Sequence, residues 1–292
     1  MWRNSINCNI VNYSRNFINL MVEDEEMEEW RLTCYYGYPE RERRRQAWDL
    51  LRELRDMSDH PWCIIGDFND LLSQEDKNGT NPHPNWLCSG FRSAVSDCDL
   101  TDIQLEGYPY TWTKSRGSVN VIEERLDRAM ADSKWLMNYP NVKLMNLLTS
   151  HSDHSPILLQ TSPTVQHGRI HSFRFENGLL KEDDIHEVVE DGWGSERNGD
   201  IISKTMRCAE KLTGWGRRKR MRFKQEVAEC SEELERLRGL HDAANSGRYK
   251  EIQEKHARLL VQEEAYWRQR EKMHWLKDGD LNTKFFHMSA SS

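Results

Sequence analysis

The sequence predicts a layered α/β domain in the first half of the chain and an α-helical hairpin in its last third. Up to about Gln160, short apolar runs alternate with helical patterns, the order of elements that builds a layered α/β domain. One run, at 62–66, is almost wholly apolar, as in a strand covered on both faces. The whole chain is 37% hydrophobic and 30% charged, with a mean hydropathy of −0.86, so part of it is expected to be an exposed helical extension.

The first elements are expected to be strands. Strand-like runs cover residues 8–14, 16–22 and 30–37, and the last two are predicted to form a hairpin across the acidic turn at 23–29. A helix follows Pro39, because apolar side chains recur there at helical spacing, at Ala47, Leu50, Leu51, Leu54 and Met57.

The rest of the α/β domain, expected to span residues 1–160, continues this alternation. The predicted elements are a strand at 62–66, a helix at 91–98, strands at 108–114 and 124–130, a short helix led by Asp132, and a final strand at 155–160. The stretch ERLDRAM (124–130) is expected to lie in one strand.

Beyond residue 160 the alternation of short strands and helices ends. Residues 161–212 contain Pro163 and several glycines and are expected to form a weakly ordered connector. Residues 213–292 are expected to form two antiparallel helices, a coiled-coil hairpin broken at Asn245-Ser246-Gly247. The apolar stripes that would pack them together are Phe223, Val227, Leu234 and Leu237 on the first helix, and Tyr249, Ile252, Leu259, Tyr266 and Met273 on the second.

Charge and cysteine usage limit the classes of function. The net charge of −7 argues against attraction of the whole protein to nucleic acid, so any such contact must use local basic patches. Seven cysteines without a CxxC pair, and no signal peptide, predict free thiols in a reducing compartment, hence a nuclear or cytoplasmic protein that is not secreted. No membrane association and no small-molecule cofactor are expected.

Four stretches place polar groups just after apolar runs: CYYGYP, GDFND, ERLDRAM and SHSDHSP. Taken singly, each stretch is better explained by a turn, a surface ion pair or a loop. Taken together they converge, because the strand ends of one α/β domain meet at a common edge. The candidate residues are Tyr36, Asp67, Asn69, Asp127, Asp153 and His154.

These residue types suit metal-assisted hydrolysis of a phosphodiester. Carboxylates with an Asn amide oxygen suit a hard divalent cation such as Mg²⁺ or Mn²⁺. A histidine beside a carboxylate suits a base or an electrostatic partner, and a tyrosine can donate to a phosphate oxygen. Together they would direct water at a phosphodiester.

The order YG…GDFN…RLDRA…SDHSPI resembles the endonuclease/exonuclease/phosphatase superfamily, whose fold DNase I and apurinic endonucleases share. Further stretches, among them FRFENGLL and YWRQREKMHWLKDGDLNTKFFH, resemble plant LINE-type (non-LTR) retrotransposon polyproteins, where they run from the endonuclease into the linker ahead of the reverse transcriptase. The resemblance covers nearly the whole chain. It implies a DNase I-like layered sandwich, incomplete at its N-terminus, and magnesium-dependent endonuclease activity on DNA.

The resemblance also implies a role for each candidate residue. Asp67 would orient or deprotonate the attacking water, and Asn69 would position the water or the phosphate. Asp127 would fix the tautomer of His154, which would stabilise charge on the phosphoryl group. Asp153 would lie at the metal or its waters, and Tyr36 would contact the phosphate.

One departure from the family pattern matters for activity. Family members begin with a strand bearing an Asn and continue to a strand ending in the Glu that is the principal metal ligand, and this sequence resembles only the segments after those two strands. We therefore expect weak metal binding, little or no hydrolysis and reduced stability.

Two basic clusters are candidates for contact with nucleic acid. The first, at 41–45, is interrupted by Glu42 and follows Glu40, which favours a solvated helix face. The second, the basic run, is predicted with equal weight to be a solvated face or a phosphate-binding site for DNA or RNA. Its members are Arg217, Arg218, Lys219, Arg220, Arg222 and Lys224.

Three functions therefore stand after the sequence alone. The first is a metal-dependent DNA phosphodiesterase, a hydrolase impaired in this chain. The second is a non-catalytic nucleic-acid-binding or helical interaction fragment. The third is an enzyme of the same fold acting on another phosphoester, which the retrotransposon-like tail disfavours.

Overall fold

The computed structural model describes residues 7–23, 28–115, 120–149, 152–161, 182–194 and 200–278, with side chains described as far as Glu264. The tip of the acidic turn, His151, residues 162–181 of the expected connector and the side chains of Tyr266 and Met273 lie outside the described residues. The chain divides into two compact units: residues 1–166 with 237–248, and residues 167–236 with 249–292.

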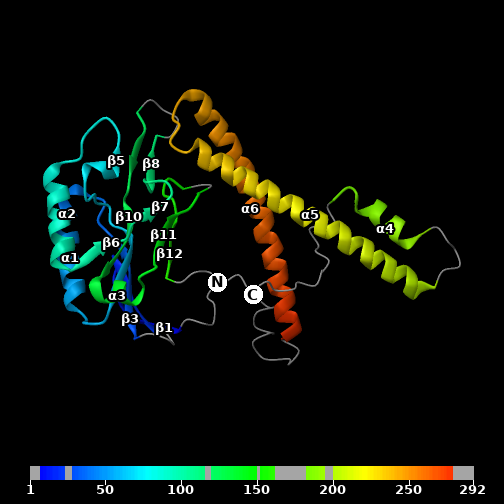
Figure 1. The fold of residues 1–292 in the computed structure, drawn as a ribbon, viewed down its shortest axis with the longest axis horizontal. Coiled ribbons are helices and arrows are strands. Elements are labelled where there is room, and N and C mark those ends of the chain that lie inside the picture. The colour runs from blue at the N-terminus through cyan, green and yellow to red at the C-terminus, as the bar shows by residue number, and fades with distance from the viewer. Residues whose placement is uncertain are drawn as a thin grey trace. The chain divides into compact units, whose positions relative to one another are not determined.

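Six strands form the main sheet of the first unit (Figure 1). Their order is β1-β2-β3-β4-β10-β6, with bounds β1 Asn7–Tyr13, β2 Phe17–Glu23, β3 Trp30–Tyr36, β4 Trp62–Asp67, β10 Asp127–Asp132 and β6 Leu100–Asp102. Strands β2 and β3 are antiparallel neighbours, which confirms the predicted hairpin, whereas β3 and β4 run parallel. At the centre, Trp62, Cys63 and Ile64 are wholly buried, which confirms a strand covered on both faces.

Different layers cover the two faces of the main sheet. On one face, Trp62 and Ile64 pack with helices α1 (Arg44–Asp56) and α2 (Asn85–Asp97), and the short 3-10 turn η1 (Arg41–Arg43) leads into α1. On the other face, Cys63 packs with Trp135 of α3 (Ser133–Asn138) and with a small sheet of β12 (Ile157–Gln160), β11 (Lys143–Asn146) and β7 (Leu105–Glu106). Asp132 begins α3 as expected, because its carboxylate accepts from the Trp135 backbone N–H at 2.8 Å.

The single strand expected at ERLDRAM was wrong. The chain leaves one strand, β9 (Ile122–Glu124), and enters β10 at Asp127. Strand β9 belongs to a separate sheet with β5 (Lys77–Asn78) and β8 (Trp112–Lys114), and η2 (Gln74–Asp76) precedes β5. The break occurs because the Arg125 guanidinium turns to the Asp102 carboxylate at 3.1 Å, while buried Arg128 pairs with Asp76 and Asp102. Short strands β5, β6, β7 and β11 carry too few residues for a periodic signal.

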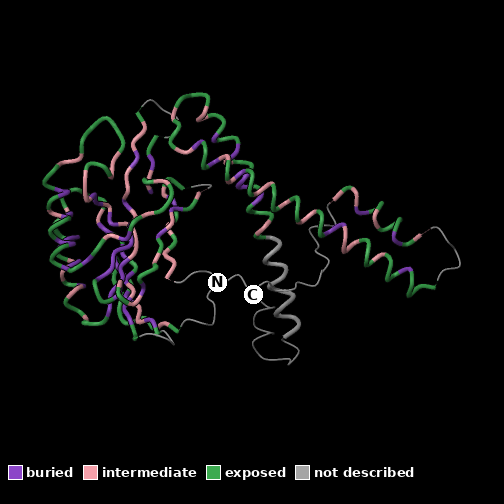
Figure 2. Tube along the Cα trace, viewed as in Figure 1, coloured by how far each residue is buried: buried purple, intermediate pink, exposed green. Residues whose placement is uncertain are grey.

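Helices begin earlier in the second half than the sequence indicated. Helix α4 (Ile185–Trp193) lies within the segment expected to be a connector, and α5 (Ile201–Leu237) starts well before residue 213. Helix α6 (Ala243–Asp278) follows, and α5 and α6 pack together, with Ser231 Oγ 3.2 Å from His256 Nε2. Leu234, Leu237, Tyr249, Ile252 and Leu259 of the predicted stripes are buried, and Figure 2 shows buried stretches on both helices.

The predicted break at Asn245-Ser246-Gly247 was wrong, because those residues lie inside α6. The turn falls instead between Leu237 and Ala243, where Gly239 has a φ of 83° and Asp242 accepts from the Asn245 backbone N–H at 3.0 Å. A left-handed glycine and a capping Asp therefore end one helix and begin the next. Across the described residues, every helix is too short or too polar to cross a bilayer.

Candidate active site

The ends of three neighbouring strands bring predicted residues side by side. In the main sheet, Tyr36 of β3 is in register with Asp67 of β4, and Asp67 is in register with Asp127 of β10. The Tyr36 side chain is exposed at this rim. The convergence expected from the strand ends is therefore present for these three residues.

Asn69 closes the turn after β4 around the Asp67 carboxylate. The Asn69 backbone N–H donates to Asp67 Oδ1, and its Nδ2 donates to Oδ2, both at 2.9 Å. Asn69 adopts a left-handed φ of 54°, a conformation that Asn tolerates better than most residues. Its Nδ2 also lies 3.2 Å from the Gly37 carbonyl oxygen, and the Gly37 N–H donates to the Asp67 carbonyl at 2.7 Å. The Asp67 carboxylate is thus held by Asn69 from the turn after β4, and the Asp67 carbonyl by Gly37, which follows β3.

The Asp67 carboxyl is in an unusual electrostatic environment. Burial, followed by the nearby negative charge of Asp127, raises its pKa to about 6, although the Asn69 backbone hydrogen bond and the charges of His154 and Arg44 oppose this rise. A carboxylate with a pKa near 6 is mostly ionised at neutral pH yet can accept a proton readily. The GDFND turn is therefore chemically different from an ordinary acidic turn.

His154 is paired with Asp127. Its Nδ1 lies 2.9 Å from Asp127 Oδ2, and the side chains are 34% and 14% exposed. The hydrogen bond to Asp127 is the largest of the influences that raise the pKa of His154, while partial burial opposes it. Because the Asp127 carboxylate oxygen accepts a hydrogen bond, it favours the tautomer in which His154 Nδ1 carries the proton, and Nε2 is the other ring nitrogen.

A residue absent from the predictions, Thr111, supports this pair. Its Oγ1 accepts from the backbone N–H groups of Leu126 and Asp127 at 3.0 and 2.9 Å, and its carbonyl accepts from the Ser155 N–H at 2.7 Å. Thr111 therefore joins the start of β10 to the loop that carries His154. No local pattern marks a buried threonine for this role, and YPYTWTK indicated only a strand.

Asp153, unlike Asp67 and Asp127, lies outside the main sheet and is hydrogen-bonded to an indole. It is exposed, and its Oδ2 accepts from the Trp112 indole Nε1 at 3.0 Å. This hydrogen bond is the largest cause of the lowered pKa of Asp153. The Trp112 ring also lies 6.5 Å from the His154 ring, so Trp112 borders the site.

The donor set fits a hard cation only in part. Asp67 and Asp127 present carboxylates on adjacent strands, and a cation beside them would relieve the repulsion that raises the pKa of Asp67. Within the described residues, however, no three His, Cys, Asp or Glu side chains are arranged to hold a metal ion. The residues present thus suit a cation held by two carboxylates, with water in its remaining positions.

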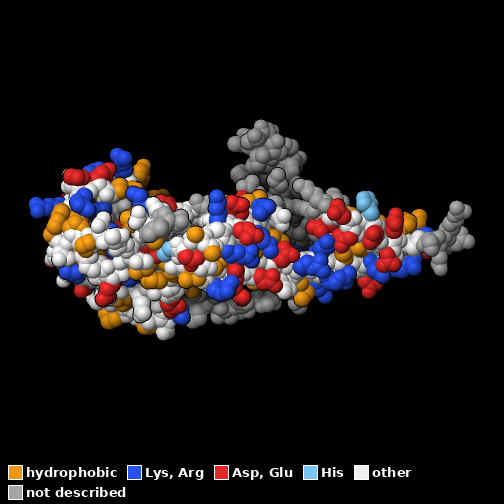
Figure 3. All heavy atoms as spheres, turned by 90° about the horizontal axis from the view of Figure 1, so that it is seen from above, with side chains coloured by type: hydrophobic (Ala, Val, Ile, Leu, Met, Phe, Trp, Pro, Cys, Tyr) orange, Lys and Arg blue, Asp and Glu red, His pale blue; other side chains and the backbone are white. Residues whose placement is uncertain are grey.

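The basic run on α5 is partly neutralised. Lys219 Nζ lies 2.6 Å from Glu182 and 3.0 Å from Asp184, so its charge is paired within the helical unit. Arg220 is half-buried. The members that remain exposed are Arg217, Arg218, Arg222 and Lys224. Figure 3 shows basic and acidic side chains interspersed over the helices.

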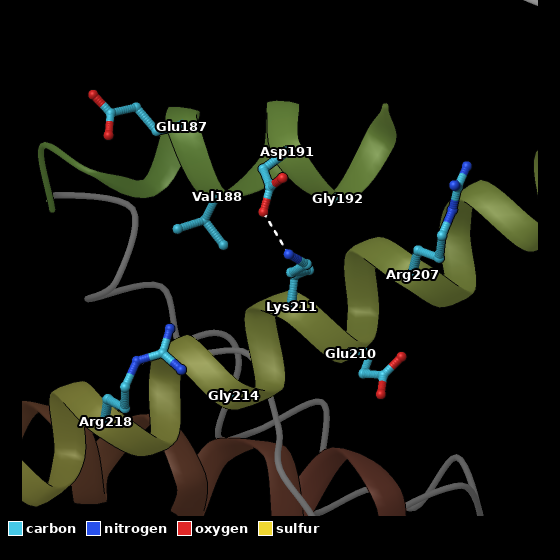
Figure 4. A pocket seen from close by; sticks show the side chains of 9 residues that line it. All are labelled: Glu187, Val188, Asp191, Gly192, Arg207, Glu210, Lys211, Gly214 and Arg218. Atoms are coloured by element: carbon cyan, nitrogen blue, oxygen red, sulfur yellow. Dashed lines mark hydrogen bonds and ion pairs between the residues drawn. The ribbon is translucent and has the colours of Figure 1, made fainter. Parts of the chain in front are cut away.

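A hollow of about 720 Å³ lies between α4 and α5 (Figure 4). Acidic and basic side chains both line it, and Lys211 Nζ pairs with Asp191 Oδ2 at 2.7 Å across it. It includes Arg218 of the basic run but none of the residues at the strand ends. Its balanced charge does not favour an anion over a cation.

Solved structures with a similar arrangement include the endonuclease domain of TRAS1, a telomere-specific non-LTR retrotransposon. That match has a TM-score of 0.42 and 14% identity, and covers 57% of this chain and 72% of that domain. A beta toxin from Staphylococcus aureus matches with a TM-score of 0.34 and 15% sequence identity, and the match covers 50% of this chain and 57% of the toxin. A truncated Caenorhabditis elegans TDP2 matches with a TM-score of 0.33 and 14% sequence identity, and the match covers 53% of this chain and 66% of the TDP2 chain. The chain therefore spans less than two thirds of the last two.

No curated protein sequence matches the chain. The sequence profile of the endonuclease/exonuclease/phosphatase family, by contrast, matches residues 3–154. That range is more than half of the 292 residues and contains all six residues predicted at the strand ends. On this match, and with mixed α/β sheets of the DNase I-like kind, the chain belongs to the endonuclease/exonuclease/phosphatase family.

Proposed function

We propose that the protein is a divalent-metal-dependent phosphodiesterase acting on DNA, of the retrotransposon endonuclease type, with weak activity. Membership of the family implies a capacity for phosphodiester hydrolysis, a divalent metal and a nucleic-acid substrate. The observation that carries the proposal is the juxtaposition of Asp67 with the Asp127–His154 pair at one sheet rim.

Each side chain at the rim has a distinct chemical task. Asp67 orients the attacking water and accepts its proton, and Asn69 fixes the direction of the Asp67 carboxylate. Asp127 holds the His154 ring through Nδ1, so that protonated His154 stabilises negative charge on the phosphoryl oxygens. Exposed Tyr36 supplies a hydroxyl for a phosphate oxygen.

A divalent cation, when bound, would add Lewis-acid stabilisation of the phosphoryl oxygens. Asp67 and Asp127 would hold it. Because no three His, Cys, Asp or Glu side chains of the described residues are arranged to hold a metal ion, we expect low affinity for Mg²⁺ or Mn²⁺ and slow turnover. Asp153, the other proposed ligand, would act through water while its carboxylate stays on Trp112.

A plasmid-nicking assay tests this function. With Mg²⁺, the full chain is expected to nick supercoiled DNA slowly, and His154→Ala is expected to lower the rate roughly 100-fold or more, the size usual for a lost group that stabilises transition-state charge. The control is His186→Ala, which removes an exposed histidine on α4 and should leave the rate unchanged. Nicking that is absent, or equal in His154→Ala and wild type, would count against the proposal.

A second function, non-catalytic binding of DNA or RNA, is favoured by one observation. Four cations of the basic run are exposed along a single stretch of α5. Such a stretch binds phosphates without sequence preference. It does not require a metal, so titration with Mg²⁺ separates it from hydrolysis at Asp67.

A further inference from the structure

The turn between α5 and α6 belongs to the same compact unit as the family domain, although it follows that domain by some 80 residues in sequence. The segment 237–248 comprises this turn and the start of α6, and it contains Gly239 at a left-handed φ of 83°. A Cβ at Gly239 would lie only 3.0 Å from the Tyr108 hydroxyl oxygen, so the backbone passes directly over the Tyr108 side chain. The turn is therefore closely fitted to the domain.

Arg238 makes the central contacts of this turn. Its Nη2 donates to Asn146 Oδ1 at 2.9 Å and to Ser155 Oγ at 2.7 Å. Its guanidinium carbon lies 4.6 Å from the centre of the Tyr108 ring. Asn146 and Ser155 are both 6% exposed, so these charge-assisted hydrogen bonds are shielded from water.

A second contact fastens the same turn. His241 Nε2 lies 3.1 Å from Oε2 of Glu123, which is 1% exposed. Glu123 accepts hydrogen bonds from the Tyr108 hydroxyl at 2.6 Å and from Asn78 Nδ2 at 3.1 Å. The buried carboxylate is thus held by side chains of the domain and lies against His241, three residues after Arg238.

The residues that Arg238 holds are directly connected to the candidate active site. Ser155 follows His154 in the chain, and its N–H donates to the Thr111 carbonyl, while Thr111 Oγ1 accepts from the Asp127 N–H. Asn146 Nδ2 donates to the carbonyls of Tyr108 and Tyr110 at 2.7 and 2.9 Å, just before Thr111. Arg238 therefore braces both segments that set the distance between His154 and Asp127.

We propose that Arg238 is a positioning residue, which holds the His154 loop against β10 from the α5–α6 turn of the same compact unit, outside the residues that the family matches. Only the catalytic consequence of this bracing rests on the proposed function. The bracing itself is a statement about the loop and is testable without DNA or metal.

Hydrogen–deuterium exchange of the full chain tests the bracing. Two amides report it: Ser155 N–H, which donates to the Thr111 carbonyl, and Thr113 N–H, which donates to the Asp153 carbonyl at 3.0 Å. In Arg238→Ala, peptides covering these amides are expected to exchange roughly 10- to 100-fold faster, the loss expected for a hydrogen bond to a charged group. Peptides from β4 are expected to keep their wild-type protection.

The matched control is Arg236→Ala. Arg236 lies two residues earlier, has a side chain 71% exposed and pairs with Glu233 on its own helix, so its loss should leave both amides unchanged. Ser155→Ala removes one acceptor of Arg238 with little risk to folding and is expected to loosen the same peptides to a smaller extent. Arg238→Lys retains the cation and is expected to restore part of the protection.

Two results would overturn the proposal: wild-type exchange at both amides in Arg238→Ala and Ser155→Ala, or equal loss of protection in every peptide including β4. Nicking gives the separate catalytic readout, where Arg238→Ala is expected to lower kcat about 10-fold with KM unchanged. If wild type does not nick DNA, the proposed function fails, while the exchange result still decides the bracing.

Discussion

At the scale of single residues, the sequence indicated which side chains meet but not how their environments differ. Tyr36 and Asp67 end strands that apolar runs reveal, whereas Asp127 begins β10 at a position that the sequence placed inside a strand. The raised pKa of Asp67 depends on burial and on Asp127, which lies 60 positions away, and no local pattern contains that information. The hydrogen bond between Asp153 and Trp112 was equally hidden.

The environment of Asp67 predicts a stability that varies with pH. Its folded pKa, about 6, lies above the usual 3.8, so its favourable contribution is present below about pH 4 and is lost as the pH rises through 6. Ionised Asp67 therefore costs stability at pH 8, on the order of 1–3 kcal/mol. We expect Asp67→Asn to raise the melting temperature at pH 8 by more than it does at pH 4, in thermal melts without metal.

Asp49→Asn supplies the comparison for this prediction. The Asp49 side chain is 69% exposed and pairs with Arg52 on the same helix, so its substitution should have a small effect that changes little between the two pH values. If Asp67→Asn and Asp49→Asn showed the same pH dependence, Asp67 would be an ordinary surface carboxylate.

At the scale of elements, long periodic segments were predictable and short or interrupted ones were not. Helix α1, strand β4 and the β2–β3 hairpin follow from apolar spacing alone. The division of ERLDRAM between two sheets depends on ion pairs to Asp76 and Asp102, which only the fold brings near. The helix break was predicted at Asn245-Ser246-Gly247, whereas the chain turns at Gly239, which has a left-handed φ, and Asp242 caps the next helix.

Two glycines with opposite surroundings make this element-level account testable. A Cβ at Gly37 would collide with the Phe68 carbonyl, which lies in the turn that carries Asn69, so Gly37→Ala is expected to destabilise the protein by roughly 1–3 kcal/mol. A Cβ at Gly247, inside α6, meets nothing within 4 Å. Gly247→Ala is therefore expected to stabilise by about 0.5–1 kcal/mol, because alanine favours a helix.

Urea unfolding of both variants measures these free energies, and the sign of each effect is the decisive feature. A neutral Gly37→Ala would mean that β3 and the GDFND turn are not in close contact. A destabilising Gly247→Ala would place the helix break at residues 245–247, where the sequence first suggested it.

At the scale of the whole molecule, the family, the layered fold and the helical extension were all accessible from the sequence, because ordered motifs and composition extend over long stretches. The participation of residues 237–248 in the first unit was not accessible. It depends on Arg238 and His241 meeting Asn146, Ser155 and Glu123 across large separations in sequence. A domain boundary placed at residue 160, where the sequence pattern changes, excludes this turn.

The chain carries a net charge of −7, so binding to DNA must come from a local concentration of cations. Reversing Arg217, Arg218 and Arg222 to Glu removes three exposed cations of the basic run and should weaken binding to duplex DNA. If each contacts a phosphate, the slope of log affinity against log salt becomes shallower by roughly 3.

The control reverses Lys250, Lys255 and Arg258 on α6, three exposed cations with the same total change in charge. Fluorescence anisotropy across a salt series separates the two cases. Equal weakening by both triple variants would assign binding to overall charge, and affinity independent of salt would remove the basic run from the interface.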